Sequence, residues 1–218
     1  LSIMVQAGLR QSVYIRDILL QESLKAVESI EKGEPSPALT NVLEAVIVLA
    51  GTVGGYAGRY GRMAGAHAIH NGLTFIAETH HVLHGQKVAY GILVQLALEG
   101  RTNDIRELLP LYEALGFPKR LSDLGIAENL AQAKQTIAAH ACKPEESLCL
   151  MGTFSEADVL FLYFDVYLRA FFQFFNLLPE FFLTFLLFEH LLDLRFYVLK
   201  LRRFLLAIFL LCGVLIVV

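Results

Sequence analysis

The chain has 218 residues, with 18 lysines and arginines against 21 aspartates and glutamates, and its formal net charge is −3. This length suffices to bury a hydrophobic core, and the charge balance excludes the basic surface by which proteins bind nucleic acid. The three cysteines form neither an even set nor a CxxC pair. This argues against a disulfide-stabilised secreted domain and favours the reducing cytoplasm.

The N-terminal part of the chain predicts two helices. Residues 12–31 carry apolar side chains at helical spacing, and the breaker segment 32–35 follows. The apolar stripe consists of Leu20, Leu24 and Val27. Ser36 then provides an N-cap with Pro37 at the first helical position, and the helical phase continues through residues 46–49. We therefore expect a pair of helices joined by a short break.

A glycine-rich run, residues 51–58, follows the second helix. It fits neither GxGxxG nor the Walker loop, so it does not predict a phosphate site. Small residues at this density are typical of helices that pack closely together.

Three further helices are predicted beyond the glycine-rich run. Residues 86–99 are apolar nearly all round, which indicates a helix in the middle of a bundle. Residues 105–115 form an amphipathic helix that Gly116 ends, and another helix runs over 128–140. We expect the inner side of this last helix to carry Leu130, Ala133, Ile137 and Ala141. The fold class is all-α, a helical bundle.

Histidines cluster between His67 and His84, a segment that holds five of the seven in the chain. His67 and His70 would share one face of a helix, while His80, His81 and His84 come just before the next one. Neutral imidazole is the commonest protein ligand for metals. Spacing alone leaves two interpretations open, a metal site and buried histidines with hydrogen-bond partners, because no short signature such as HExxH fixes the geometry.

The segment from residue 54 to 100, with HAIHNG and THHVLHG, resembles the metal-binding core of the iron-containing (group III) alcohol dehydrogenase superfamily, nearest to its glycerol dehydrogenase branch. The resemblance includes LGFP at 115–118 and LSDLGI at 121–126, and covers most of residues 35–158. It implies the all-α C-terminal domain of a dehydroquinate synthase-like fold. We assign residues 1–168 to this helical metal-binding domain.

The resemblance also implies the site. In this family one aspartate and two histidines hold a divalent metal, zinc or iron, and the matching histidines here are His67 and His84. The metal helps an alcohol to pass hydride to NAD, so the expected substrate is a small alcohol or polyol. His70 and His81 are candidates for catalytic roles and Asn71 for binding the cofactor, and all three are also candidates for orienting the ligands.

Two parts of the family pattern are missing. The α/β domain that binds NAD in family members has no counterpart here, and the aspartate ligand would lie upstream of Leu1. We therefore expect this chain to be a C-terminal fragment of a longer enzyme, and we expect the fragment to be inactive by itself. The whole enzyme is a candidate homo-oligomer. The alternative is a non-catalytic helical remnant that binds a membrane or a protein partner.

Residues 144–150 depart from glycerol dehydrogenases, which carry GETIHN there, because this chain has no histidine in that segment. Glycerol, another polyol and an aldehyde all stay open as substrates. The related glycerol-1-phosphate dehydrogenases and dehydroquinate synthases share a similar metal frame.

Residues 169–218 form a hydrophobic tail that matches nothing in the family. All phenylalanines except Phe75 and Phe117 lie at or after Phe154. Three interpretations are open: a membrane anchor, a buried helical hairpin, and translation of a shifted reading frame. Membrane contact is expected only if the tail is genuine.

Overall fold

The computed structural model describes residues 1–160, in which every regular element is a helix or a helical turn. The α-helices are α1 (Ile3–Lys32), α2 (Pro37–Glu44), α3 (Ala50–Ala57), α4 (Arg59–Arg62), α5 (Gly65–Leu73), α6 (His84–Leu98), α7 (Thr102–Leu115) and α8 (Leu130–Ala141). The shorter turns are η1 (Ala45–Leu49), η2 (Ala77–Thr79), η3 (Ser122–Leu124) and η4 (Ser147–Leu150). The all-α prediction is confirmed, whereas the tail, residues 169–218, lies outside the described residues.

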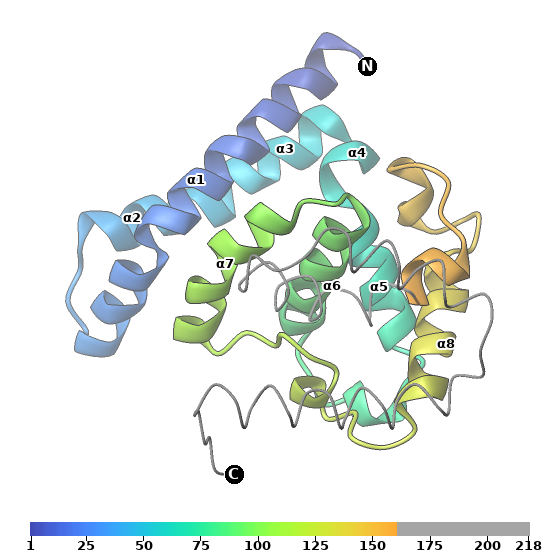
Figure 1. Ribbon diagram of the computed structural model, residues 1–218. Coiled ribbons are helices and arrows are strands. Elements are labelled where there is room, and N and C mark those ends of the chain that lie inside the picture. The colour runs from blue at the N-terminus through green and yellow to red at the C-terminus, as the bar shows by residue number, and fades with distance from the viewer. Residues whose placement is uncertain (161–218) are drawn as a thin grey trace, which may run out of the picture. The chain divides into compact units, whose positions relative to one another are not determined.

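Helix α1 runs antiparallel to α2 and α3 and contacts both (Figure 1). Its 30 residues extend for about 45 Å, and it ends at Gly33, which adopts the left-handed conformation with φ of 67°. The predicted N-cap of α2 is confirmed, because the Ser36 side chain accepts a hydrogen bond from Leu39 N–H at 3.2 Å. The helical phase continues beyond α2 as expected, through the π-helical turn η1.

The apolar stripe predicted for α1 is not its buried face. Leu24 is 48% exposed and Val27 37% exposed. The buried positions on α1 are instead small: Gly8, Ala26 and Ser29. Small residues let the helix axes approach closely, and the large apolar side chains are left on the outer surface of this hairpin.

The segment Pro37–Ala57 combines α2, η1 and α3. The segment is 21 residues long and contains an 18-residue window with a mean hydropathy of 1.6, so by length and composition this described segment is able to cross a membrane. Core helices of soluble proteins share this length and composition.

Close packing by small residues brings α1 against α3. A Cβ added to Gly8 would lie 2.9 Å from the Cβ of Ala57, nearer than two carbon atoms can pack. The glycine-rich run therefore packs on α1 through Ala57, whereas Cβ atoms added to Gly51, Gly55 and Gly58 would meet nothing within 4 Å, so its interpretation as a packing segment is correct only in part.

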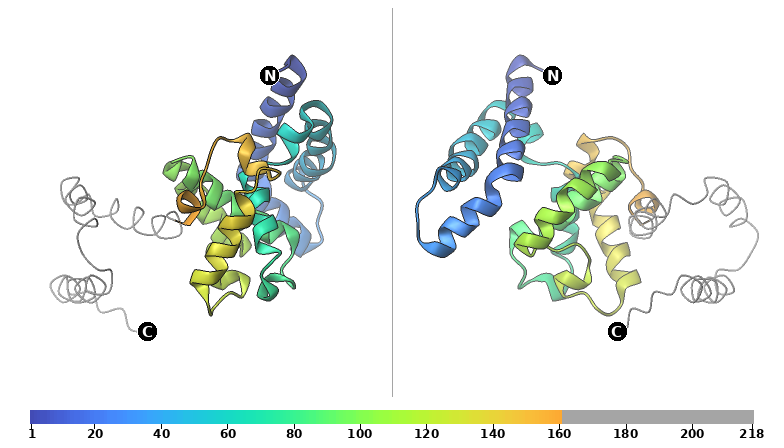
Figure 2. Two further views of the ribbon diagram at one scale, coloured as in Figure 1. Left: turned by 90° about the vertical axis from the view of Figure 1, so that its right-hand side faces the viewer. Right: turned by 60° about the vertical axis from the view of Figure 1, so that its left-hand side comes forward.

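Helix α5 packs against both α6 and α8, and two further views show these helices as a group beside the hairpin (Figure 2). A Cβ on Gly72 of α5 would lie 2.7 Å from the carbonyl oxygen of Ile137 in α8, and Gly91 of α6 meets the backbone of α5 at Ala66. The side chains of α6 enter two hydrophobic clusters, one through Tyr90 and one through Leu93. The expected central position of α6 is confirmed.

Helix α7 ends where the sequence predicts, and most of the predicted inner side of α8 is buried. Gly116 ends α7 with φ of 66°. Ala133, Ile137 and Ala141 of α8 are buried as expected, but Leu130, the first residue of the helix, is 41% exposed.

Candidate metal centre

Side chains from other elements hold the first turn of α5. The backbone N–H of Ala66 donates to Gln95 Oε1 of α6 at 2.9 Å, and the hydroxyl of Ser147 donates to the carbonyl of Ala64 at 2.7 Å. Ala64, the N-cap residue, offers no side-chain oxygen, so Gln95 takes the place of an ordinary cap by accepting from a first-turn N–H, while Ser147 anchors the start of the helix through its carbonyl. They fix the helix that carries His67 and His70.

The connection from α5 to α6 is held by a buried threonine and a buried lysine. Thr79 is fully buried, and its hydroxyl lies 2.7 Å from the carbonyl oxygen of Leu73. The ammonium of Lys87, a residue only 7% exposed, donates to the carbonyl of Thr79 at 3.4 Å. This places His84, the first residue of α6, against the exposed side of α5.

Three of the clustered histidines meet. The ring centroids of His67 and His84 are 5.9 Å apart, with the planes tilted by 46°. Those of His70 and His84 are 4.3 Å apart, and His84 Nδ1 lies 3.0 Å from His70 Nε2. The two histidines predicted as metal ligands therefore come together from separate helices.

A line of hydrogen bonds continues from His70. Its Nδ1 lies 3.0 Å from Asn71 Oδ1, and the amide nitrogen of Asn71 donates to Glu146 Oε2 at 2.9 Å. Glu146 immediately precedes η4, which packs against α5. The side chain of Asn71 thus joins the histidine pair to a carboxylate.

The environment favours uncharged imidazoles. Burial, followed by the neighbouring rings of His84 and His70, lowers the pKa of His67. Burial is also the main cause that lowers the pKa of His70, with the charges of His84 and Lys87 acting in the same direction and Asn71 and Glu146 opposing. Metals bind the neutral form of imidazole, so these shifts suit ligands.

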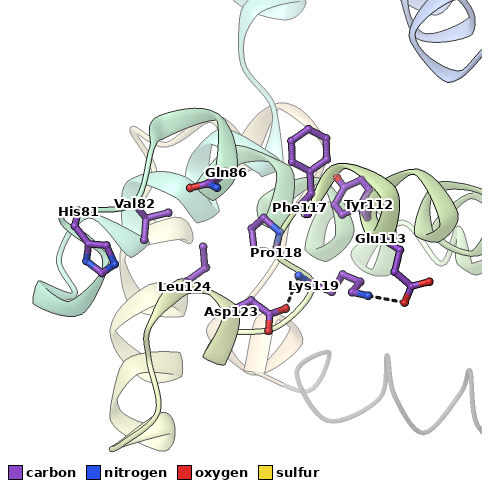
Figure 3. A pocket seen from close by; sticks show the side chains of 11 residues that line it. His81, Val82, Gln86, Tyr112, Glu113, Phe117, Pro118, Lys119, Asp123 and Leu124 are labelled. Carbon is purple, nitrogen blue, oxygen red and sulfur yellow. Dashed lines mark hydrogen bonds and ion pairs between the residues drawn. The ribbon is translucent and has the colours of Figure 1, made fainter. Parts of the chain in front are cut away.

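The other histidines lie elsewhere. His81 lines a cavity of about 380 Å³ whose other walls include Tyr112 and Asp123 (Figure 3). His80 Nε2 is 3.0 Å from the carbonyl oxygen of Thr74. The ring of His140 stacks on Phe75 at a centroid distance of 3.5 Å. His140 already lay outside the predicted cluster, whereas sequence spacing could not separate His80 and His81 from the histidines that meet.

Glu146 was missed by the sequence analysis. Residues 144–150 attracted notice there for a missing histidine, and no spacing rule connects Glu146 to a side chain 75 positions earlier. Only the packing of η4 on α5 brings the two together.

A complete metal site is not present in the part of the chain that the structure describes. No group of three or more His, Cys, Asp or Glu side chains there is placed to hold an ion. The donor set of His67 and His84 nevertheless fits a divalent cation, since the two ring centroids lie 5.9 Å apart and the surroundings favour the neutral form of His67.

Comparison with known proteins finds similar dehydrogenases. The chain is 41% identical over 144 residues to a glycerol dehydrogenase of Pseudomonas putida, a match that covers 66% of this chain and 38% of the relative. It is 37% identical over 160 residues to hydroxycarboxylate dehydrogenase A of Escherichia coli, covering 73% of this chain and 44% of that one. No protein-family model matches the chain.

Solved structures agree with these relatives. A probable glycerol dehydrogenase from Sinorhizobium meliloti superposes with a TM-score of 0.67 at 31% identity, covering 74% of this chain and 45% of that one. Glycerol dehydrogenase from Schizosaccharomyces pombe gives a TM-score of 0.67 at 28% identity, covering 79% and 44%. The chain therefore spans less than half the length of the proteins that it matches.

The helical fold and these matches define the class: this is the all-α C-terminal domain of the iron-containing alcohol dehydrogenase superfamily. Within that superfamily, the homologues of the chain are glycerol dehydrogenases and related hydroxycarboxylate dehydrogenases. The resemblance found in the sequence is confirmed.

Proposed function

We propose that this chain is the metal-binding part of an NAD-linked dehydrogenase that acts on the CH–OH group of a small alcohol or polyol such as glycerol. The observation that carries the proposal is the approach of His67 and His84, from two helices, to a ring distance of 5.9 Å. The names of the homologues support the reaction class. The dinucleotide-binding domain and the third ligand, an aspartate, would come from outside the described residues.

The chain's own side chains take distinct parts in this proposal. His67 and His84 would hold the ion, and His70 and Asn71 would support them. The chemistry that bound zinc or iron supplies is stabilisation of charge on the alcohol oxygen, which helps hydride leave the adjoining carbon for the nicotinamide. His81, in its cavity, is the candidate for contact with substrate, while the hydrogen bonds of Asn71 favour support of His70 over direct contact with the cofactor.

The compartment proposed for the enzyme is the cytoplasm. Cys142 and Cys149 are both free thiols in the structure. Unpaired cysteines suit a reducing environment.

The experiment joins this chain to the part of the Pseudomonas putida glycerol dehydrogenase that it does not cover. We expect the fusion to retain about one zinc ion per chain, as a single site would, and to reduce NAD in the presence of glycerol. His67→Ala and His84→Ala should lose both properties, because a catalytic site with one histidine fewer cannot hold the ion. His140→Ala is the control and should keep both, since His140 stacks on Phe75. Full activity in the His84→Ala fusion would contradict the proposal.

A further inference from the structure

Four side chains form a continuous line from a carboxylate to a predicted metal ligand: Glu146, Asn71, His70 and His84. The three distances between their polar atoms are 2.9, 3.0 and 3.0 Å. Asn71 and His70 belong to α5, His84 is the first residue of α6, and Glu146 immediately precedes η4. Each of the three hydrogen bonds has a donor and an acceptor. The carboxylate of Glu146, at one end of the line, decides the direction of all three bonds.

A carboxylate oxygen only accepts hydrogen bonds, so the amide NH₂ of Asn71 must point to Glu146. The carbonyl oxygen of Asn71 then faces His70 Nδ1, and that nitrogen must carry the proton. A neutral imidazole has one N–H, which leaves His70 Nε2 as an acceptor. His84 Nδ1 must therefore donate to it, and the lone pair of His84 lies on Nε2.

We propose that Glu146, acting through Asn71 and His70, is a positioning residue that keeps the proton of His84 on Nδ1 and frees Nε2 to bind a divalent cation. This inference rests on the proposed function, because it takes His84 as a ligand. It assigns a role to Glu146, which touches neither the cation nor the substrate.

The surroundings keep this arrangement in place. Glu146 is held by its backbone N–H, which donates to the carbonyl of Lys143 at 3.0 Å, and by the bond from its neighbour Ser147 to Ala64. The carboxylate therefore belongs to the packed frame of α5.

The test measures the tautomer of His84 directly. The full chain, metal-free and labelled with ¹⁵N in its histidine rings, is examined by NMR, with the His84 signals identified by their loss in His84→Gln. Asn71→Leu removes both bonds of the amide, and Glu146→Gln permits both hydrogen-bond directions because its amide can donate as well as accept. Glu145→Gln is the matched control, since Glu145 is the exposed neighbour.

We expect protonated Nδ1 and bare Nε2 on His84 in the wild type and in Glu145→Gln. A mixture of tautomers is expected in Asn71→Leu and in Glu146→Gln. Zinc affinity, measured by competition with a chelator, should weaken about tenfold or more in Asn71→Leu, as is usual when the partner of a metal-binding histidine is lost. Glu146→Gln conserves the size of the side chain. If Asn71→Leu does not fold, the tautomer of His84 is therefore measured in Glu146→Gln.

Two results would overturn the inference: a proton on His84 Nε2 in the wild type, or a zinc affinity unchanged in a variant whose tautomer has shifted. Failure of the proposed function looks different. In that case His84→Gln would bind zinc as well as the wild type does, while the tautomer of His84 would still be read from the metal-free chain.

Discussion

At the scale of single residues, burial separates the two described cysteines. Burial first, and then the carboxylates of Glu156 and Asp158, raise the pKa of Cys142, whereas Cys149 is exposed. A raised pKa means less thiolate at neutral pH, so alkylation of Cys142 by iodoacetamide should be slower than that of Cys149. Its rate should also keep rising with pH beyond the range where an ordinary thiol levels off. Peptide mass spectrometry after timed labelling measures both rates.

The same experiment in urea provides the control for this prediction. Unfolding removes the burial and the two carboxylates, so the rates at the two cysteines should become similar. Faster labelling of Cys142 than of Cys149 in the folded chain would contradict the prediction.

The histidines show what residue-scale information in the sequence could and could not predict. The motif resemblance singled out His67 and His84, and the structure brings these two together. It could not distinguish His70, which bonds His84, from His81, which lines a separate cavity. That difference depends on the path of the chain after α5, which the buried hydroxyl of Thr79 fixes.

At the scale of elements, α5 packs on α8 through Gly72. Ala in place of this glycine would put a methyl group 2.7 Å from the backbone oxygen of Ile137, and a backbone atom cannot move aside as a flexible side chain can. We expect Gly72→Ala to lower the free energy of unfolding by about 1 to 3 kcal/mol, the usual cost of overpacking. Urea denaturation followed by circular dichroism measures the change.

Gly51 of α3 is the matched control, because a Cβ added there would meet nothing within 4 Å. Gly51→Ala should raise the free energy of unfolding by up to about 1 kcal/mol, since alanine is the better helix former. Equal effects of the two substitutions would show that packing of α5 on α8 is not the cause.

The π-helical turn η1 offers a second test at this scale. Ala45 is fully buried against its neighbours, while Ile47, two residues on, is 68% exposed. Ala45→Gln should destabilise the chain by about 2 kcal/mol or more, because it forces a larger polar group into a packed site. Ile47→Gln should change the stability by less than about 0.5 kcal/mol, as surface substitutions usually do.

Thermal or urea unfolding of both variants measures the two changes in stability. If Ile47→Gln proves as damaging as Ala45→Gln, the outer face of α2 and α3 is covered in solution by another part of the protein or by a partner.

At the scale of the whole molecule, the proposed function requires more than the described residues contain. Among residues 1–160, two predicted ligands meet, and no strand is present to build a nucleotide-binding sheet. We therefore expect the 218-residue chain by itself to show no glycerol-dependent reduction of NAD, because neither the ion nor the hydride acceptor is fully held. Absorbance at the NADH band measures this, and clear turnover by the isolated chain would contradict the account.

The sequence by itself determined the fold class, the ends of α1 at Gly33 and of α7 at Gly116, and two of the histidines that meet, whereas α1 begins at Ile3, nine residues before its predicted start. Helical spacing, the cap at Ser36 and the stop at Gly116 act through neighbours along the chain, so a linear pattern contains them. Tertiary structure alone decided which face of α1 is buried and which side chains support the histidines. The hydrogen bond between Asn71 and Glu146 joins side chains 75 positions apart, and it exists because small residues let α5 and its neighbours pack closely enough for polar side chains to meet.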